Sequence, residues 1–170
     1  MYEKSIELLN KAVADEMAAV HQYMYFHFHC DDQGFELLSA LFKKVAIEEM
    51  IHVEKLADRI LFLKGDVEMK ANAEVQKIHD VKAMLEFAIK SEEEARLAYN
   101  QWAIECGNAA DSQTKKLFED LVMEEEGHWD QFDNEMDNLE RFGSEYLAHQ
   151  SFERSKKRGA MGMPPGHPAV

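Results

Sequence analysis

Two short stretches decide how this chain folds: Glu49-Met50-Ile51-His52 and Glu125-Glu126-Gly127-His128. Both read Glu-x-x-His, and residues three apart on a helix project from one face. Each stretch lies in a run with apolar residues at every third or fourth position, which is typical of an amphipathic helix. The two patterns therefore predict a carboxylate and an imidazole on the core-facing side of two separate helices.

The same period marks four helices, each of roughly 25 to 30 residues. The first carries its apolar stripe from Ile6 to His27, and the second opens after Gly34 and stops at Lys64-Gly65. The third begins at an Asp80 cap and runs to Gly107, and the fourth starts near Asp111 or Ser112 and ends at Gly143. The sequence thus predicts an all-α protein.

The connections between these helices are unequal in length. Short turns join the first helix to the second and the third to the fourth, whereas residues 65–79 show no period. A link of that length can cross a bundle if it is extended, which makes helices two and three parallel. One long crossover is the connectivity of a ferritin-like four-helix bundle. Residues 144–157 then predict a short fifth C-terminal helix with Tyr146, Leu147 and Phe152 as its apolar residues.

Composition excludes several functions. The 170 residues include 19 Lys and Arg against 33 Asp and Glu, a net charge of −14, which repels nucleic acid. Cys30 and Cys106 are the only cysteines, so a disulfide framework, a zinc ribbon and a rubredoxin-like iron site are excluded within one chain. No apolar run approaches a bilayer span or a signal peptide. We expect a cytoplasmic protein with no nucleic acid and no membrane partner.

Four carboxylates and two imidazoles occupy the stripes that should face the core: Glu16, Glu49, His52, Glu92, Glu125 and His128. Buried carboxylates are strongly disfavoured unless they are protonated, paired or metal-bound, and few Lys or Arg face the core. Two divalent cations would neutralise all four. Taken singly, each Glu is more simply a solvated residue and each His a structural one.

The spacing of these six residues also repeats. The interval from Glu16 to Glu49 equals the interval from Glu92 to Glu125, and every member of the first half recurs in the second half at one constant offset. A dinuclear metal site with a pseudo-twofold axis is the interpretation that accounts for this register. The neighbouring acids are more simply solvated, with iron transit as their alternative: Glu48, Glu93, Glu94, Glu124 and Glu126.

Tyr23 is a candidate catalytic residue. It lies two helical turns after Glu16 on the same face, where its hydroxyl could bond a ligand carboxylate or donate an electron during oxidation. An ordinary core tyrosine is the alternative.

At these motifs, with Arg59-Ile60-Leu61-Phe62-Leu63-Lys64-Gly65, the chain resembles bacterioferritins over about residues 1–157. The resemblance implies a ferroxidase centre of two iron ions per subunit, held by the six residues, that oxidises Fe(II) with O₂ or H₂O₂. It also implies a hollow shell of 24 subunits, built from dimers, that stores ferric mineral. The second Glu-x-x-His differs from ordinary non-haem ferritins, and the lack of a four-cysteine domain argues against intact rubrerythrin.

Bacterioferritins also bind haem b between two subunits through one methionine from each, and Met50 occupies the matching position. A packing or dimer-interface methionine is the alternative. Many family members carry an inner-surface His where this chain has Lys44, so the chain departs here from the pattern of a further iron site. Residues 158–170, rich in Gly, Met and Pro, are expected to form a flexible tail outside the family pattern.

Two rival functions remain open from the sequence. One is a di-iron peroxide reductase that turns over without storing iron. The other is a non-enzymatic shell that binds haem or buffers metal. The iron stored per chain distinguishes these possibilities.

Overall fold

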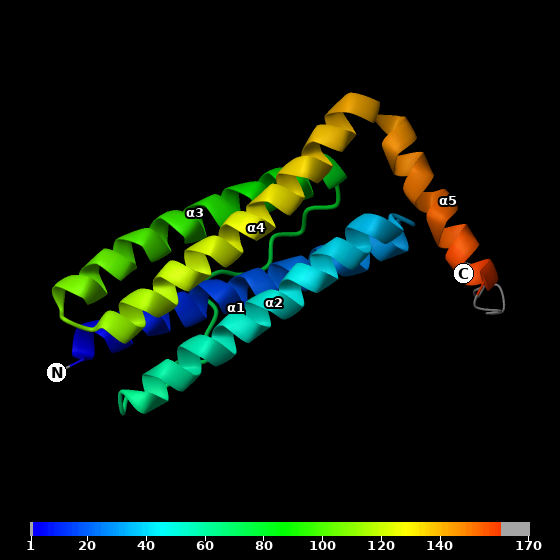
Figure 1. The fold of residues 1–170 in the computed structure, drawn as a ribbon. Helices are drawn as coiled ribbons and strands as arrows, with labels where there is room; N and C mark the ends of the chain where they lie inside the picture. The colour runs from blue at the N-terminus through cyan, green and yellow to red at the C-terminus, as the bar shows by residue number, and fades with distance from the viewer. Residues whose placement is uncertain (1, 161–170) are drawn as a thin grey trace.

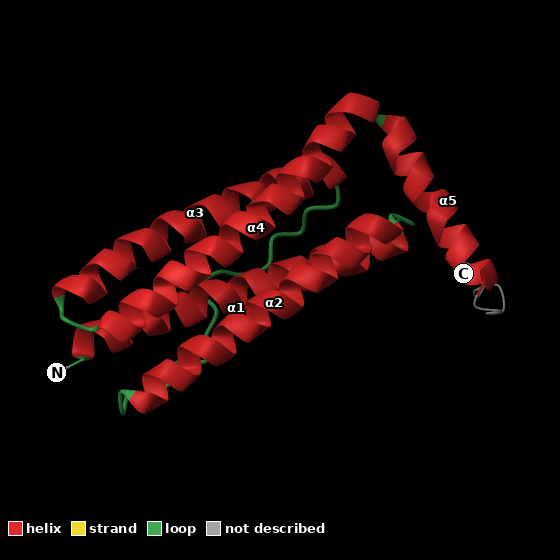
Figure 2. Cartoon of the chain, in the orientation of Figure 1, coloured by secondary structure: helices red, strands yellow, loops and turns green. Residues whose placement is uncertain are grey.

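The computed structural model describes residues 2–160, which form a bundle of long helices (Figure 1). All regular structure in this range is helical, as Figure 2 shows. The elements are α1 Glu3–Asp32, α2 Glu36–Phe62, α3 Val81–Asn108, α4 Ser112–Phe142 and α5 Ser144–Ala160. The prediction of an all-α protein with four long helices and a shorter fifth is confirmed. In the part described, none of the helices is both long and apolar enough to cross a bilayer.

Side-chain caps set the starts of the third and fourth helices where the sequence predicted them. The Asp80 carboxylate accepts from the backbone N–H of Ala83, and that of Asp111 accepts from Thr114. Such caps satisfy backbone donors that the first helical turn leaves unpaired. At the other end of α4, Gly143 adopts a φ of 54°, a conformation that glycine takes without steric cost.

Helix α2 ends slightly earlier than predicted. Its last residue is Phe62, and Lys64 lies in the left-handed region with a φ of 66°. Gly65 is needed for a close approach, because a Cβ at this position would lie 2.7 Å from Ile6 Cγ2 on α1. The glycine therefore lets the chain leave α2 directly against α1.

The link between α2 and α3 runs along the bundle, so that α2 and α3 are parallel as predicted (Figure 1). It is tied to α1 and its C-cap residue at three successive levels, by hydrogen bonds from Asn10 Nδ2 to Asp66 O (3.0 Å), Gln22 Nε2 to Gln76 O (3.0 Å) and the C-cap Gln33 Nε2 to His79 O (3.1 Å). These bonds satisfy link carbonyls that have no partner in a helix or sheet.

The core consists of two apolar clusters rather than one. The Phe42 cluster includes Phe26, Leu85 and Phe132, and the Phe118 cluster includes Leu9, Leu56 and Tyr99. Each fully buried Leu or Phe contributes about 1.5 to 3 kcal/mol, so the two clusters stabilise the bundle at both ends. Between them lies a layer of buried polar side chains.

Helix α5 leaves the end of α4 at an angle and is anchored at its beginning (Figure 1). The Tyr146 hydroxyl donates to Glu135, and the buried Gln150 accepts from the Leu38 backbone N–H at 3.1 Å. Phe152, one of the apolar residues predicted for this helix, is 65% exposed.

The predicted boundary at residue 157 stays a prediction. Helix α5 continues past it to Ala160. The rest of the predicted flexible tail, residues 161–170, lies outside the described residues.

Candidate metal centre

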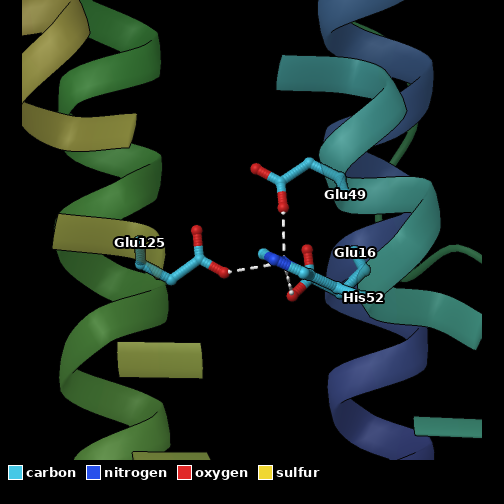
Figure 3. A group of neighbouring side chains, drawn as sticks. All are labelled: Glu16, Glu49, His52 and Glu125. Atoms are coloured by element: carbon cyan, nitrogen blue, oxygen red, sulfur yellow. Dashed lines mark ion pairs between the residues drawn. The ribbon is translucent and has the colours of Figure 1, made fainter. Parts of the chain in front are cut away.

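The polar layer between the two clusters is made by the six residues that the sequence singled out, one or two from each long helix. Their exposed fractions are all between 0% and 4%: Glu16 on α1, Glu49 and His52 on α2, Glu92 on α3, and Glu125 and His128 on α4. The 3.6-residue period points each of them inward from the middle of its helix. Figure 3 shows Glu16, Glu49, His52 and Glu125 converging between the helices.

The six side chains divide into two overlapping groups. Glu16 and His52 belong to one group, Glu92 and His128 to the other, and Glu49 and Glu125 to both. Within each group the candidate ligand atoms lie within 4.8 Å of one another. Two carboxylates shared between two positions is the arrangement expected where carboxylates bridge two metal ions.

Distances around the two imidazoles repeat this division. His52 Nδ1 lies 2.8 Å from Glu49 Oε2, 3.1 Å from Glu125 Oε1 and 3.3 Å from Glu16 Oε1. His128 Nδ1 lies 3.0 Å from Glu49 Oε1, 3.2 Å from Glu125 Oε2 and 3.6 Å from Glu92 Oε2. Each Nδ1 therefore faces three carboxylates, two of them common to both.

This donor set fits two divalent cations. Among the described residues, three of its buried atoms find no hydrogen-bond partner of good geometry: Glu49 Oε2, His52 Nδ1 and Glu125 Oε1. Such orphaned atoms cost about 1 to 3 kcal/mol each unless something else binds them. All ion pairs described for the four carboxylates come from His52 or His128, and none from Lys or Arg. Two divalent cations would neutralise the four charges and occupy the orphaned atoms.

When no cation is bound, protons on the buried carboxylates and imidazoles balance the negative charge of the layer. Burial raises the pKa of Glu16 and Glu92 well above the ordinary value of 4.5, and the nearby Glu49 carboxylate adds to the rise. Burial acts to lower the pKa of both imidazoles, but close carboxylates outweigh it and the pKa rises. For Glu125, burial acts to raise the pKa, but contact with the two imidazoles lowers it. Metal binding must displace these protons.

Two tyrosines support the layer from the apolar clusters. The Tyr23 hydroxyl donates to Glu92 Oε1 and the Tyr99 hydroxyl to Glu16 Oε1, and both rings are fully buried. Burial, with the adjacent carboxylate, raises the pKa of both hydroxyls, so they remain donors. A bond to a ligand carboxylate was one of the roles predicted for Tyr23. Tyr99 was missed, although the offset that relates Glu16 to Glu92 also relates Tyr23 to Tyr99.

Two acids that the sequence predicted to be solvated contact the imidazoles from outside. Glu124 Oε2 lies 2.8 Å from His52 Nε2, and Glu48 Oε2 lies 3.1 Å from His128 Nε2. Both side chains are partly exposed, at 36% for Glu48 and 41% for Glu124, so they meet solvent as expected and in addition contact a candidate ligand. The constant offset of the repeat relates these two acids as well. By contrast, the side chains of Glu93, Glu94 and Glu126 are exposed, as expected.

A cavity of about 400 Å³ reaches the layer from the side where the crossover lies between α1 and α3. Its inner wall includes Glu16, Tyr23, Glu92 and Tyr99, and small residues widen it: Ala18, Ala19, Ala95 and Ala98. Side chains of the link, among them Asn72, line its outer part. Small molecules can thus lie directly beside the buried carboxylates.

Met50 lies apart from this layer. Its side chain is 50% exposed on the outside of α2, with Ile47, Ile51 and Leu61 also exposed at 44%, 40% and 55%. The methionine therefore does not pack in the core of this chain. Lys44 is also exposed and donates to Gln131 Oε1 at 2.7 Å.

Residues 6–142 match the model of the family described as Ferritin-like domain. The chain is 36% identical over 145 residues to the bacterioferritin of Desulfovibrio desulfuricans, covering 85% of this chain and 81% of the relative. It is 34% identical over 142 residues to the bacterioferritin of Brucella melitensis, covering 84% and 88%.

The same likeness appears among solved structures. An X-ray structure of the Desulfovibrio desulfuricans bacterioferritin, which describes its diiron site in different catalytic states, aligns with a TM-score of 0.85 at 35% identity. The alignment covers 87% of this chain and 86% of that one. The resemblance noted from the sequence motifs is confirmed.

Proposed function

Since the chain belongs to the ferritin-like domain family, in which bacterioferritins match it over most of its length, we propose that it is an iron-storing ferroxidase. It binds two iron ions within each subunit, oxidises Fe(II) with O₂ or H₂O₂, and stores the ferric product in a hollow shell. The observation that carries the proposal is the pair of buried four-residue groups that share Glu49 and Glu125.

The proposed ligands have distinct roles. Glu16 and His52 would hold one ion and Glu92 and His128 the other, and Glu49 and Glu125 belong to both groups and would serve both ions. When bound, the two Fe(II) ions supply one electron each to an oxidant that accepts two. Hard carboxylate oxygens favour the ferric state, so the donor set favours oxidation. Tyr23 and Tyr99 hold the terminal carboxylates in place, and the cavity beside them admits small reactants.

The test is an anaerobic Fe(II) titration followed by air, with particle mass measured in parallel. We expect about two tightly bound ions per chain, rapid oxidation and then a ferric load far above two per chain. A load that stays near two with rapid peroxide turnover would instead identify a peroxide reductase. No oxidation would identify a metal buffer.

We further propose that Met50 binds haem b between two subunits. The half-exposed Met50 side chain on an apolar stripe supports this, since haem needs an apolar surface and a soft axial ligand supplied from each side. Met50→Leu should abolish the visible spectrum of a bis-methionine haem without changing the initial rate of Fe(II) oxidation. Met123→Leu is the matched control, because Met123 is 70% exposed on α4. An unchanged haem spectrum in Met50→Leu would discard the assignment.

The assembly that we propose is a cytoplasmic homo-oligomer, a 24-subunit shell built from dimers. The apolar stripe of α2 supports a paired surface, because exposed apolar patches of this kind mark interaction sites. The particle mass from the iron titration tests it, and a monomer would contradict the proposed storage.

A further inference from the structure

The outer nitrogens of the two imidazoles are held by equivalent acids, but these acids are anchored differently. On the His52 side, Glu124 lies 2.8 Å from Nε2, and Lys55 Nζ lies 2.7 Å from each oxygen of that carboxylate. Lys55 comes from α2, one turn after His52, so the three side chains form a closed bridge from α2 to α4. The His52 side chain is 0% exposed.

On the His128 side the bridge is looser. Glu48 lies 3.1 Å from Nε2, and the nearest cation, Lys44 Nζ, is 3.7 Å from Glu48 Oε1. Lys44 instead donates to Gln131 at 2.7 Å. The constant offset of the repeat relates Lys55 of the first half to Gln131 of the second half. The second half therefore has a neutral amide where the first half has a cation.

A metal-binding histidine is oriented by the partner of its other nitrogen, and that partner also raises the basicity of the ligand. A glutamate whose carboxylate is fixed by a cation already keeps one geometry. A glutamate without such an anchor samples more rotamers, so it loses more conformational entropy when it holds the imidazole in place. The difference in anchoring therefore bears on how firmly each ion is bound.

We propose that Glu124 and Glu48 are positioning residues that direct Nδ1 of His52 and His128 into the metal centre, and that the Lys55 anchor makes the His52 position the tighter of the two. This inference rests on the proposed function. It makes the ion held by Glu92 and His128 the more readily exchanged one.

The test is an anaerobic Co²⁺ titration of the full chain, followed by visible absorption and by calorimetry. The parent should bind two ions with separable affinities. Glu124→Ala should weaken the tighter event by about 10- to 100-fold, and Glu48→Ala the weaker event by a similar factor. Glu124→Gln, which keeps an acceptor, should restore part of the loss, and Lys55→Met should weaken the tighter event alone.

Further variants assign and control the two events. Glu16 belongs only to the His52 group and Glu92 only to the His128 group, so Glu16→Ala should remove the tighter event and Glu92→Ala the weaker. Glu119→Ala is the matched control, since Glu119 is also on α4 and pairs with a lysine, Lys115, at 3.5 Å. It should bind Co²⁺ like the parent.

The outcomes separate the two claims. A parent that binds fewer than two Co²⁺ per chain contradicts the proposed function itself. A parent that binds two ions with equal affinity, or alanine variants at Glu48 and Glu124 that bind like the parent while retaining the helical circular dichroism signal, overturns the positioning inference alone.

Discussion

The α1–α2 half and the α3–α4 half of the bundle are alike at the centre and different outside it. At the centre, each residue of the first half has a counterpart at the same offset in the second, as Glu16 has Glu92 and Tyr23 has Tyr99. The support crosses between the halves, because Tyr23 on α1 donates to Glu92 on α3. Tyr99 on α3 likewise donates to Glu16 on α1, so each half completes the site of the other.

Outside the centre the two halves diverge. The exposed Ile47, Met50 and Ile51 of α2 correspond to Met123, Glu126 and Gly127 of α4, so only α2 keeps a continuous apolar outer stripe. A side chain caps the N-terminus of α3 and of α4, whereas α1 and α2 begin without a side-chain cap. Ligand geometry thus constrains both halves equally, while outer surfaces and helix starts are free to differ.

The largest effect should follow from removing one ligand from each half. Glu49→Ala combined with His128→Ala should slow Fe(II) oxidation by at least about 100-fold, because loss of an outer-shell partner alone costs 10- to 100-fold in metal sites. Stopped-flow absorbance of ferric product measures the rate. The bundle should stay folded, because a metal-free layer with fewer buried charges has less to desolvate. Parent-like oxidation in this variant would refute the ligand assignment for both halves.

The second-largest effect is the stabilisation of the fold by a redox-inert cation. This stabilisation should increase as pH rises. The raised pKa of Glu16 and Glu92 means that the folded chain binds more protons than the unfolded one, so metal-free stability falls as pH rises above 4.5. The raised pKa of both imidazoles likewise makes metal-free stability fall as pH rises above 6.5. Zn²⁺ competes with these protons, so its effect has the opposite trend.

At 100-fold excess of Zn²⁺ over Kd, each site should add about 2.7 kcal/mol. The melting temperature measured with Zn²⁺ and with chelator should therefore differ by about 5 to 10 °C per site near neutral pH. The gap should shrink towards pH 5. Changing all four carboxylates to Gln, at Glu16, Glu49, Glu92 and Glu125, is the control. A pH-independent gap, or the same gap in the control, would show that Zn²⁺ binds elsewhere.

A smaller effect distinguishes the two halves at their tyrosines. Tyr23→Phe and Tyr99→Phe each remove one hydrogen bond to a buried carboxylate, worth about 1.5 to 3 kcal/mol. The two variants should lose equal stability of the Zn²⁺-loaded form in thermal melts, since the bonds are equivalent. If Tyr23 also donates an electron, the other role predicted from the sequence, Fe(II) oxidation should slow more in Tyr23→Phe. Equal rates in the two variants would leave Tyr23 a positioning residue.

The smallest effect concerns the side-chain N-caps, which α3 and α4 have and α1 and α2 lack. Burial acts to raise the pKa of Asp111, but bonds from Thr114 and Arg59 outweigh it, so the pKa is lowered from 3.8. Asp111 therefore stabilises the fold above pH 3.8, and this contribution is lost as pH falls through its folded value. Urea unfolding at neutral pH should show a loss of about 1 to 2 kcal/mol in Asp111→Ala and about 1 kcal/mol in the exposed cap variant Asp80→Ala. A larger loss in Asp80→Ala would mean that the Arg59 contact adds nothing.

Local sequence was sufficient to define the helices, their order and the candidate ligands. Periodicity and capping are local properties, so Asp80 and Asp111 could be placed at helix starts, and six polar residues on apolar stripes could be recognised as a set. The length of residues 65–79 was enough to predict the parallel arrangement of the second and third helices.

The side chains that support those ligands were set by the packing of the helices against one another. Tyr99 reaches Glu16 across 83 residues of sequence, and Glu124 reaches His52 across 72. Such contacts depend on how far each helix is rotated and shifted against its neighbour, and single ångströms decide whether an off-stripe glutamate meets an imidazole or water. The sequence repeat shows that Glu48 and Glu124 are equivalent, but the lysine that anchors one of them more firmly than the other is a property of the packed bundle.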